Sequence, residues 1–144
     1  MPIPTEIISK YSSCCVIDSS AEIKFSESGC TLYIQNPSLK YCHVFNVDGC
    51  IITKGIRCDY LINIDGIDTS VFLELKGSDL DHAYEQLSHT STSLDELRLG
   101  KIIWLLCYSG RPSFVTSIQN MIFKARSNYN ARLLVQKSES RFTV

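Results

Sequence analysis

The sequence predicts an α/β domain of the mixed (α+β) kind, in which helices pack on a β-sheet. The 144 residues are 44% apolar and 20% charged, the composition of an ordinary globular domain. The apolar period is two in the first half and becomes 3.6 after Lys76-Gly77. Hairpin strands followed by strands that alternate with helices indicate a mixed sheet. We expect a single domain over residues 1–144.

The first half is expected to form one helix and four strands. The helix is expected over 3–14, and the strands over 31–35, 41–47, 58–64 and 70–75. Asn36-Pro37 ends the first strand, because proline cannot donate to a β-ladder and asparagine favours turns. Asp48-Gly49 closes the second, and the segment 65–68, Asp-Gly-Ile-Asp, predicts a hairpin turn between the last two.

The second half is expected to alternate helices and strands. Ser78 is the expected N-cap of a helix with Asp81 at its third position, and the polar stretch 88–93 is expected to end it. The apolar run 101–108 is typical of a strand covered on both faces. A second amphipathic helix follows residues 110–112, with Phe114, Ile118, Met121, Ile122 and Ala125 on its apolar face. Residues 131–136 are expected to close the chain as a last strand, and Trp104 and the phenylalanines to lie in the core.

The net charge of −1 conceals an asymmetry between the two parts of the chain. Residues 1–97 carry six Lys/Arg against fourteen Asp/Glu, and residues 98–144 carry eight against one. Such asymmetry suggests a surface that faces a polyanion, although attraction between the two parts, or solvation of separate faces, explains it equally well. The candidates for phosphate contact in the basic part are Arg111, Lys124 and Arg126.

The cysteines do not predict a metal site. The seven, at 14, 15, 30, 42, 50, 58 and 107, include no CxxC pair, and the three histidines do not complete a zinc ligand set. We expect reduced thiols, and we assign no role to the adjacent pair Cys14-Cys15.

The sequence favours a cytoplasmic protein without a membrane span. No apolar run approaches the roughly 18 residues that a spanning helix needs. The start, Met-Pro-Ile-Pro-Thr-Glu, lacks the basic and apolar regions of a secretory signal.

A pair of carboxylates stands out in the hairpin. If its strands pair symmetrically about the bond between Gly66 and Ile67, Asp59 lies opposite Glu74, with Cβ atoms roughly 5 Å apart. The strand period of two places Lys76 on the face of Glu74. Two like charges in this arrangement favour a neutralising divalent cation, and oxygen ligands suit Mg²⁺ or Mn²⁺.

Two carboxylates and an amine predict phosphodiester chemistry. The carboxylates can hold a cation against a scissile phosphate, where the metal lowers the pKa of a bound water. Lys76 can orient or deprotonate that water, or neutralise charge on the phosphoryl oxygens. The plainer alternative is that Asp59 and Glu74 are ordinary polar hairpin residues and that Lys76 is their salt-bridge partner.

Three segments resemble the core of the PD-(D/E)XK nuclease superfamily. They are Arg57-Cys58-Asp59-Tyr60-Leu61-Ile62, Phe72-Leu73-Glu74-Leu75-Lys76-Gly77 and Ala83-Tyr84-Glu85-Gln86-Leu87. The resemblance implies a restriction-endonuclease-like αβββαβ core. It assigns Asp59, Glu74 and the backbone carbonyl of Leu75 to the metal. It also makes Lys76 the catalytic lysine and Gln86 a residue that positions the site. Cys58 stands where many members have proline.

The resemblance further implies a Mg²⁺-dependent nuclease that prefers DNA to RNA. A homodimer or a partner protein could supply specificity, and Glu6 or Glu22 could join the site as a further ligand. His43 could lie next to Asp59, although a hydrogen-bonded strand histidine is the commoner outcome. The competing hypothesis is a nuclease-fold protein that does not cleave and acts as a nucleic-acid-binding or regulatory subunit.

Overall fold

The computed structural model describes residues 3–144 and contains two β-sheets and three α-helices. The six-stranded sheet has the order β1 (Cys15–Asp18), β4 (Cys42–Asn46), β5 (Tyr60–Ile64), β6 (Thr69–Lys76), β7 (Lys101–Tyr108), β8 (Ala131–Lys137). The three-stranded sheet has the order β2 (Glu22–Glu27), β3 (Cys30–Gln35), β9 (Ser140–Thr143). The helices are α1 (Thr5–Lys10), α2 (Leu80–Ser93) and α3 (Ile118–Tyr129), with single 3₁₀ turns at η1 (Ser12–Cys14), η2 (Asp65–Ile67) and η3 (Asp95–Leu97).

The larger sheet is mixed, as the change of period predicts. Strands β1, β4, β5 and β6 pair antiparallel, whereas β6, β7 and β8 pair parallel. Parallel neighbours need a crossover, and α2 and α3 supply the two that are required. The expected α+β class with a mixed sheet is confirmed.

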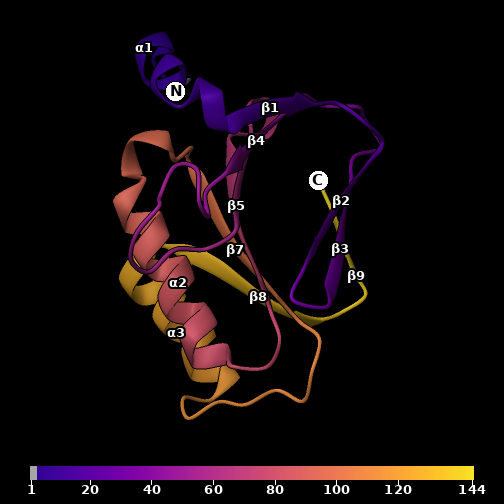
Figure 1. Cartoon of the computed structure of the whole chain (residues 1–144), viewed down its shortest axis with the longest axis vertical. Helices are drawn as coiled ribbons and strands as arrows, with labels where there is room; N and C mark the ends of the chain where they lie inside the picture. Colours follow the sequence, from indigo (N-terminus) through magenta and orange to yellow (C-terminus); the bar gives the residue numbers. More distant parts are fainter. Residues whose placement is uncertain (1–2) are drawn as a thin grey trace.

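Helices cover one face of the large sheet and the small sheet covers the other (Figure 1). Under α2 and α3, a core of Leu61, Phe72 and Trp104 is fully buried. On the opposite face, Leu73 and Leu105 pack with side chains of β2 and β3. The central strands therefore bury both of their faces, which explains why their sequences are almost continuously apolar.

The first and last strands differ from the sequence prediction. The expected helix over 3–14 is confined to Thr5–Lys10 and one 3₁₀ turn, and β1, β2 and β9 were not expected. Strand β2 buries only Ile23 and Phe25, between charged neighbours, and β1 and β9 have four residues each. Such short strands carry too few apolar side chains to be recognised, because their stability comes from the strands they pair with.

Helix α2 starts and ends differently from the prediction. Asp79 is the N-cap, and its carboxylate accepts a hydrogen bond from the His82 amide at 3.1 Å, so the expected cap at Ser78 is wrong. The helix also continues through the polar stretch to Ser93. Thr90 is buried there, where its hydroxyl donates to the Gln86 carbonyl at 2.7 Å and accepts from the Cys58 amide at 2.8 Å. These partners explain why the polar stretch does not end the helix.

Two phenylalanines that were expected in the core are exposed. Helix α3 begins at Ile118, with Ser117 as its N-cap, so Phe114 precedes the helix and is 45% exposed. Phe123 lies on the outer face of α3 and is 68% exposed. Trp104, by contrast, is buried as predicted. Within residues 3–144, no helix combines the length and apolar character needed to cross a membrane.

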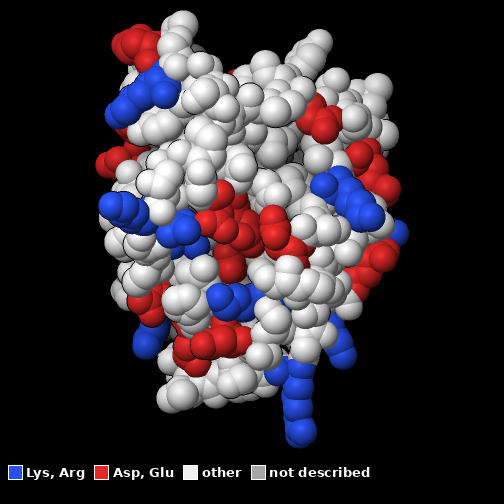
Figure 2. Space-filling model, viewed as in Figure 1, with Lys and Arg blue, Asp and Glu red and all other residues white. Residues whose placement is uncertain are grey.

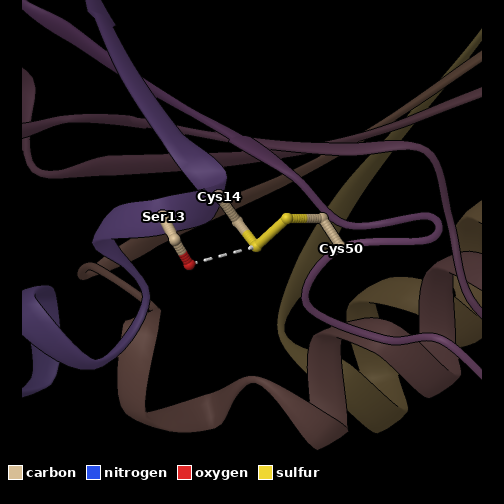
Figure 3. The surroundings of a disulfide bond; sticks show 3 residues. All are labelled: Ser13, Cys14 and Cys50. Atoms are coloured by element: carbon tan, nitrogen blue, oxygen red, sulfur yellow. Dashed lines mark hydrogen bonds between the residues drawn. A yellow bond between two sulfur atoms is a disulfide. The ribbon is translucent and has the colours of Figure 1, made fainter.

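A disulfide joins Cys14 to Cys50 (Figure 3). The expectation of reduced thiols is therefore wrong for these two residues, while Cys15, Cys30, Cys42, Cys58 and Cys107 are free. The bond spans 36 positions of sequence and ties η1 to the segment that follows β4. Sequence spacing could not reveal it, because the pairing of β1 with β4 brings the two cysteines together.

We predict that reduction of this disulfide lowers the free energy of unfolding by about 4 kcal/mol, the chain-entropy value for a loop of this length. The measurement is urea unfolding with and without a thiol reductant. A Cys14→Ser, Cys50→Ser double variant is the control, and its stability should not respond to reductant. An unchanged urea midpoint for the reduced wild-type protein would contradict the prediction.

Candidate metal centre

Asp59 and Glu74 face each other across the β5–β6 hairpin. The ladder pairs Tyr60 with Leu73, and one further step along the same register brings Asp59 opposite Glu74. The Asp59 amide donates to the Leu73 carbonyl at 3.1 Å, and the Asp59 carboxylate accepts from the Leu75 amide at 2.9 Å. The predicted symmetry about Gly66 and Ile67 is confirmed, because η2 closes the hairpin at that point.

Glu74 is a buried carboxylate with an unsatisfied oxygen. Its residue is 2% exposed, and it lies two positions beyond Phe72, on the face that α2 covers. Its Oε2 is 4.0 Å from the Lys76 ammonium, while its Oε1 is buried without a hydrogen-bond partner. Buried carboxylates are normally paired, so this oxygen indicates that a partner is missing.

Gln86 joins the lysine to the backbone beside Asp59. The Lys76 ammonium donates to the Gln86 side-chain oxygen at 3.0 Å, and the Gln86 side-chain nitrogen donates to the Arg57 carbonyl at 2.9 Å. One turn further along α2, Thr90 accepts from the Cys58 amide. Helix α2 therefore fixes the backbone directly before Asp59 and, through the same glutamine, the lysine of β6.

The environment raises the pKa of both carboxyls, and that of Glu74 more than that of Asp59. Burial, with the neighbouring Asp59 charge as the next cause, raises the pKa of Glu74 to about 9, and Lys76 opposes that rise. Burial also raises the pKa of Asp59 to about 6, against the hydrogen bond from the Leu75 amide. A cation bound between the two groups would offset the same cost by replacing the proton.

Two further acidic residues lie close enough to act on Asp59. The charges of Glu27 and Asp48 both raise the pKa of the Asp59 carboxyl. Glu27 ends β2 and accepts a hydrogen bond from the Tyr60 hydroxyl at 3.5 Å, whereas Asp48 pairs with Arg57 at 2.7 Å. Figure 2 shows acidic side chains gathered in the middle of the face it presents.

The further ligand expected from the sequence, Glu6 or Glu22, lies elsewhere. Glu22 starts β2 and accepts from the Gln35 amide group at 2.6 Å, while Glu6 lies on α1, which packs against η3. Neither joins the site. The hairpin of β2 and β3 brings Glu27, the last residue of β2, toward Tyr60. Because the sequence does not predict β2, it does not predict that Glu27 lies near the site.

His43 does not approach Asp59. Strands β4 and β5 pair as expected, but the register places His43 opposite Asn63, with its Nε2 3.4 Å from Asp65 at the turn end of the hairpin. The amides of Val47 and Asp48, directly after β4, donate to the Asp59 carbonyl at 3.0 and 3.3 Å. The suggested proximity of His43 is therefore wrong by about four positions in register.

The three basic candidates occupy different places. Arg111 follows Gly110, whose amide donates to the Gly77 carbonyl at 2.7 Å, so it lies beside the end of β6. Lys124, on α3, acts on the Asp81 carboxyl and contributes to lowering its pKa. Arg126 lines a separate cleft near the start of β7. Of the three candidates, Arg111 is the one whose neighbouring backbone contacts the end of β6.

A polar cleft adjoins the site on the side of Gln86. Its volume is about 280 Å³, and it lies between α2 and the segment after β4. Its lining includes a guanidinium, an imidazole and an amide, from Arg57, His82 and Gln86. His82 has no counterpart among the sequence-based candidates, because nothing in one sequence places it beside Arg57.

The side-chain ligand set is small. Across residues 3–144, no three His, Cys, Asp or Glu side chains are grouped in a way that would hold a metal ion. The described site instead offers two carboxylates, and the Leu75 amide that binds Asp59 places the Leu75 backbone next to them. The use of the Leu75 carbonyl as a ligand stays a prediction.

Comparison of the chain with protein-family models, curated proteins and solved structures finds no match. The geometry of the site therefore carries the functional argument.

We predict that the protein without divalent metal loses stability as the pH rises above the ordinary carboxyl range. A carboxyl whose pKa is higher in the folded than in the unfolded state contributes stability at low pH, and that contribution is lost as the pH rises through the folded value. The expected slope for Glu74 is on the order of 1 kcal/mol per pH unit. Urea unfolding in EDTA at a series of pH values measures it.

Glu74→Gln removes the titrating group and should flatten this pH profile. Glu85→Gln, at an exposed position of α2, is the matched control and should keep the wild-type slope. Parallel profiles for wild type and Glu74→Gln would show that the Glu74 proton does not govern stability.

Proposed function

We propose that the protein is a metal-dependent nuclease that hydrolyses phosphodiester bonds, with DNA as the preferred substrate. The observation that carries the proposal is the buried Glu74 carboxylate, which faces Asp59, has one oxygen without a partner and lies beside Lys76. Structural hairpins rarely bury two opposed carboxylates, because like charges directly opposite are destabilising. A cation bound between the Asp59 and Glu74 carboxylates would offset this repulsion.

The residues present fit Mg²⁺ or Mn²⁺. Asp59 and Glu74 supply carboxylate oxygens, the ligands that hard divalent cations prefer, and the Leu75 carbonyl would add a third oxygen. Glu74 Oε1 is the oxygen without a protein partner. When bound, the ion would polarise a phosphoryl oxygen and lower the pKa of a water.

Lys76 and Gln86 have distinct roles in this proposal. The Lys76 ammonium is held by the Gln86 side-chain oxygen, which leaves further N–H groups to orient water or to bind a phosphoryl oxygen. Gln86 is a positioning residue, since it reaches both Lys76 and the Arg57 carbonyl. Arg111, beside the end of β6, is placed to contact a neighbouring backbone phosphate.

The order of elements supports a restriction-endonuclease-like core. The antiparallel meander (β4, β5, β6), the crossover helix (α2) and the parallel strand (β7) follow one another in the order of that core, whereas β1, β2 and β3 stand between α1 and the meander. The proposed catalytic residues lie directly before β5, at the end of β6 and on α2. A homodimer and a cytoplasmic location stay predictions that accompany this proposal.

The second candidate is a nuclease-fold protein that binds nucleic acid or a protein partner without cleaving. The observation that favours it is the small ligand set, two side-chain carboxylates with Glu74 protonated at neutral pH because of its raised pKa. The two candidates differ in metal binding and in cleavage, which separate experiments measure.

Titration calorimetry with Mn²⁺ tests the metal site. We expect wild-type protein to bind the ion, and Asp59→Asn or Glu74→Gln to weaken binding by about tenfold or more, because each removes a carboxyl group that becomes a charged ligand when the metal replaces its proton. Asp65→Asn, at the far end of the same hairpin, is the matched control and should bind normally. Binding that is unchanged in Asp59→Asn would contradict the proposed ligand set.

Cleavage of duplex, single-stranded and branched DNA and of RNA, with and without Mg²⁺, tests the activity. Lys76→Met should reduce cleavage by about 10²-fold or more while metal binding persists, since the amine acts on the reacting groups. Gln86→Ala should reduce the rate less, and Lys54→Met, on an exposed loop, should not change it.

Two outcomes of that panel speak against the nuclease. Cleavage by Lys76→Met at the wild-type rate would refute the assigned mechanism. Absence of cleavage of every substrate by the wild-type protein would favour the second candidate, as would absence of Mn²⁺ binding in the calorimetric titration.

A further inference from the structure

A basic cleft lies at the other end of the large sheet from the carboxylate pair. It has a volume of about 280 Å³ and is formed by the starts of β7 and β8 and the last turn of α3. Lys101, Arg126 and Arg132 contribute three cationic side chains to its lining. The apolar side chains in the lining are Ile102 and Ile103, which are half-buried.

The fold itself brings these cations together. Strands β7 and β8 pair in parallel with Ile103 next to Arg132, and the period of two places Lys101 on the same face as Ile103. Helix α3 ends at Asn130, whose left-handed backbone (φ 52°) turns the chain directly into β8. This turn brings Arg126 and Arg132 to the lining of one cleft.

Within residues 3–144, no carboxylate forms an ion pair with these three cations. Among the ion pairs and side-chain hydrogen bonds of residues 3–144, none involves the side chains of Lys101, Arg126 or Arg132. Asp68 is the acidic group beside the cleft, and its carboxylate accepts a hydrogen bond from the Gly100 amide at 3.1 Å. Three like charges around one cavity repel each other, and an anion in the cavity would replace that repulsion with attraction.

We propose that this cleft binds a phosphate group. Guanidinium groups present paired N–H donors that match phosphate oxygens. Arg126 and Arg132 supply two such groups to the lining of the cleft, and Lys101 adds an ammonium. The Asn130 side chain adds a neutral donor to the lining. The phosphate could belong to a nucleic-acid backbone or to a free phosphorylated compound, and the chemistry of recognition is the same.

The proposal does not rest on the nuclease assignment, but it has a consequence for it. Glu74 pairs with Leu106 and Thr69 pairs with Lys101, so the cleft lies five residues along β7 from the carboxylates, or about 17 Å. Because five is odd, the Lys101 side chain leaves the face of the sheet opposite to that of Glu74. A nucleic acid that contacts both sites would therefore have to pass around the end of the sheet.

Binding of pyrophosphate to the metal-free protein in EDTA tests the cleft. We expect pyrophosphate to raise the melting temperature of wild-type protein above that in chloride at equal ionic strength. Arg126→Gln and Arg132→Gln should each weaken binding by about tenfold, the effect of one lost charge-assisted hydrogen bond. Both side chains are exposed, so circular dichroism should show an unchanged fold.

Arg141→Gln is the matched control. This arginine also belongs to the basic part of the chain, but it pairs with Glu139 at 3.2 Å and lies over the Tyr33 ring. Its replacement should leave pyrophosphate binding unchanged. Absence of pyrophosphate binding, or equal loss in Arg141→Gln and Arg132→Gln, would overturn the proposal.

A labelled DNA duplex distinguishes the two sources of phosphate. If a nucleic-acid backbone occupies the cleft, the duplex displaces pyrophosphate, and Arg132→Gln lowers the slope of log affinity against log salt by about one. If a free phosphorylated compound occupies it, pyrophosphate binds and the duplex does not compete. Both results support a phosphate cleft, and both are obtained with Glu74→Gln protein, so a failed nuclease assignment leaves the test intact.

Discussion

The register of the β5–β6 hairpin is the constraint on which the site depends. It places Asp59 opposite Glu74 at a position where the sheet is covered by α2, so two carboxyls share a desolvated space. Both pKa values rise because the charged forms are disfavoured there. If the register shifted by one residue, Asp59 and Glu74 would lie on opposite faces of the sheet. The repulsion between the two carboxylates would then be absent, and so would the site. The unsatisfied Glu74 oxygen is thus a direct consequence of how the two strands pair.

Several contacts from outside the hairpin hold this geometry. Gln86 and Thr90 on α2 bind the backbone of Arg57 and Cys58, immediately before Asp59. The preceding segment is held in turn by the bond from Cys50 to Cys14. A carboxylate that is costly to bury needs such fixed surroundings, because a mobile backbone would let it escape to water. Helix and disulfide therefore act on the same short segment from opposite ends.

The sequence could predict the centre of the fold and not its periphery. Strands β5, β6 and β7 carry long apolar runs, so their existence and order could be predicted. The turn between β5 and β6 has a clear sequence signal, so the apposition of Asp59 with Glu74 could be predicted from symmetry about that turn. Strand β2 buries two side chains only, and Glu27 was therefore missed as a neighbour of the site. Thr90 was interpreted as a helix end because its partner, the Cys58 amide, is 32 positions distant. Contacts of this kind depend on tertiary structure, which no local pattern contains.

The uneven charge along the sequence acquires a spatial meaning in the fold. The acidic part supplies Asp48, Asp59 and Glu74 around the carboxylate site, whereas the basic part contributes Arg126 and Arg132 to a cleft about 17 Å away along β7. Opposite charges at this separation attract only weakly in salt, since it exceeds the Debye length of about 8 Å at physiological ionic strength. Mutual attraction therefore does not explain these two clusters, although Lys124 of the basic part does act on Asp81 of the acidic part elsewhere in the fold. A ligand that carries several negative charges, and that brings a cation to the acidic end, is the binding partner we propose for the two clusters.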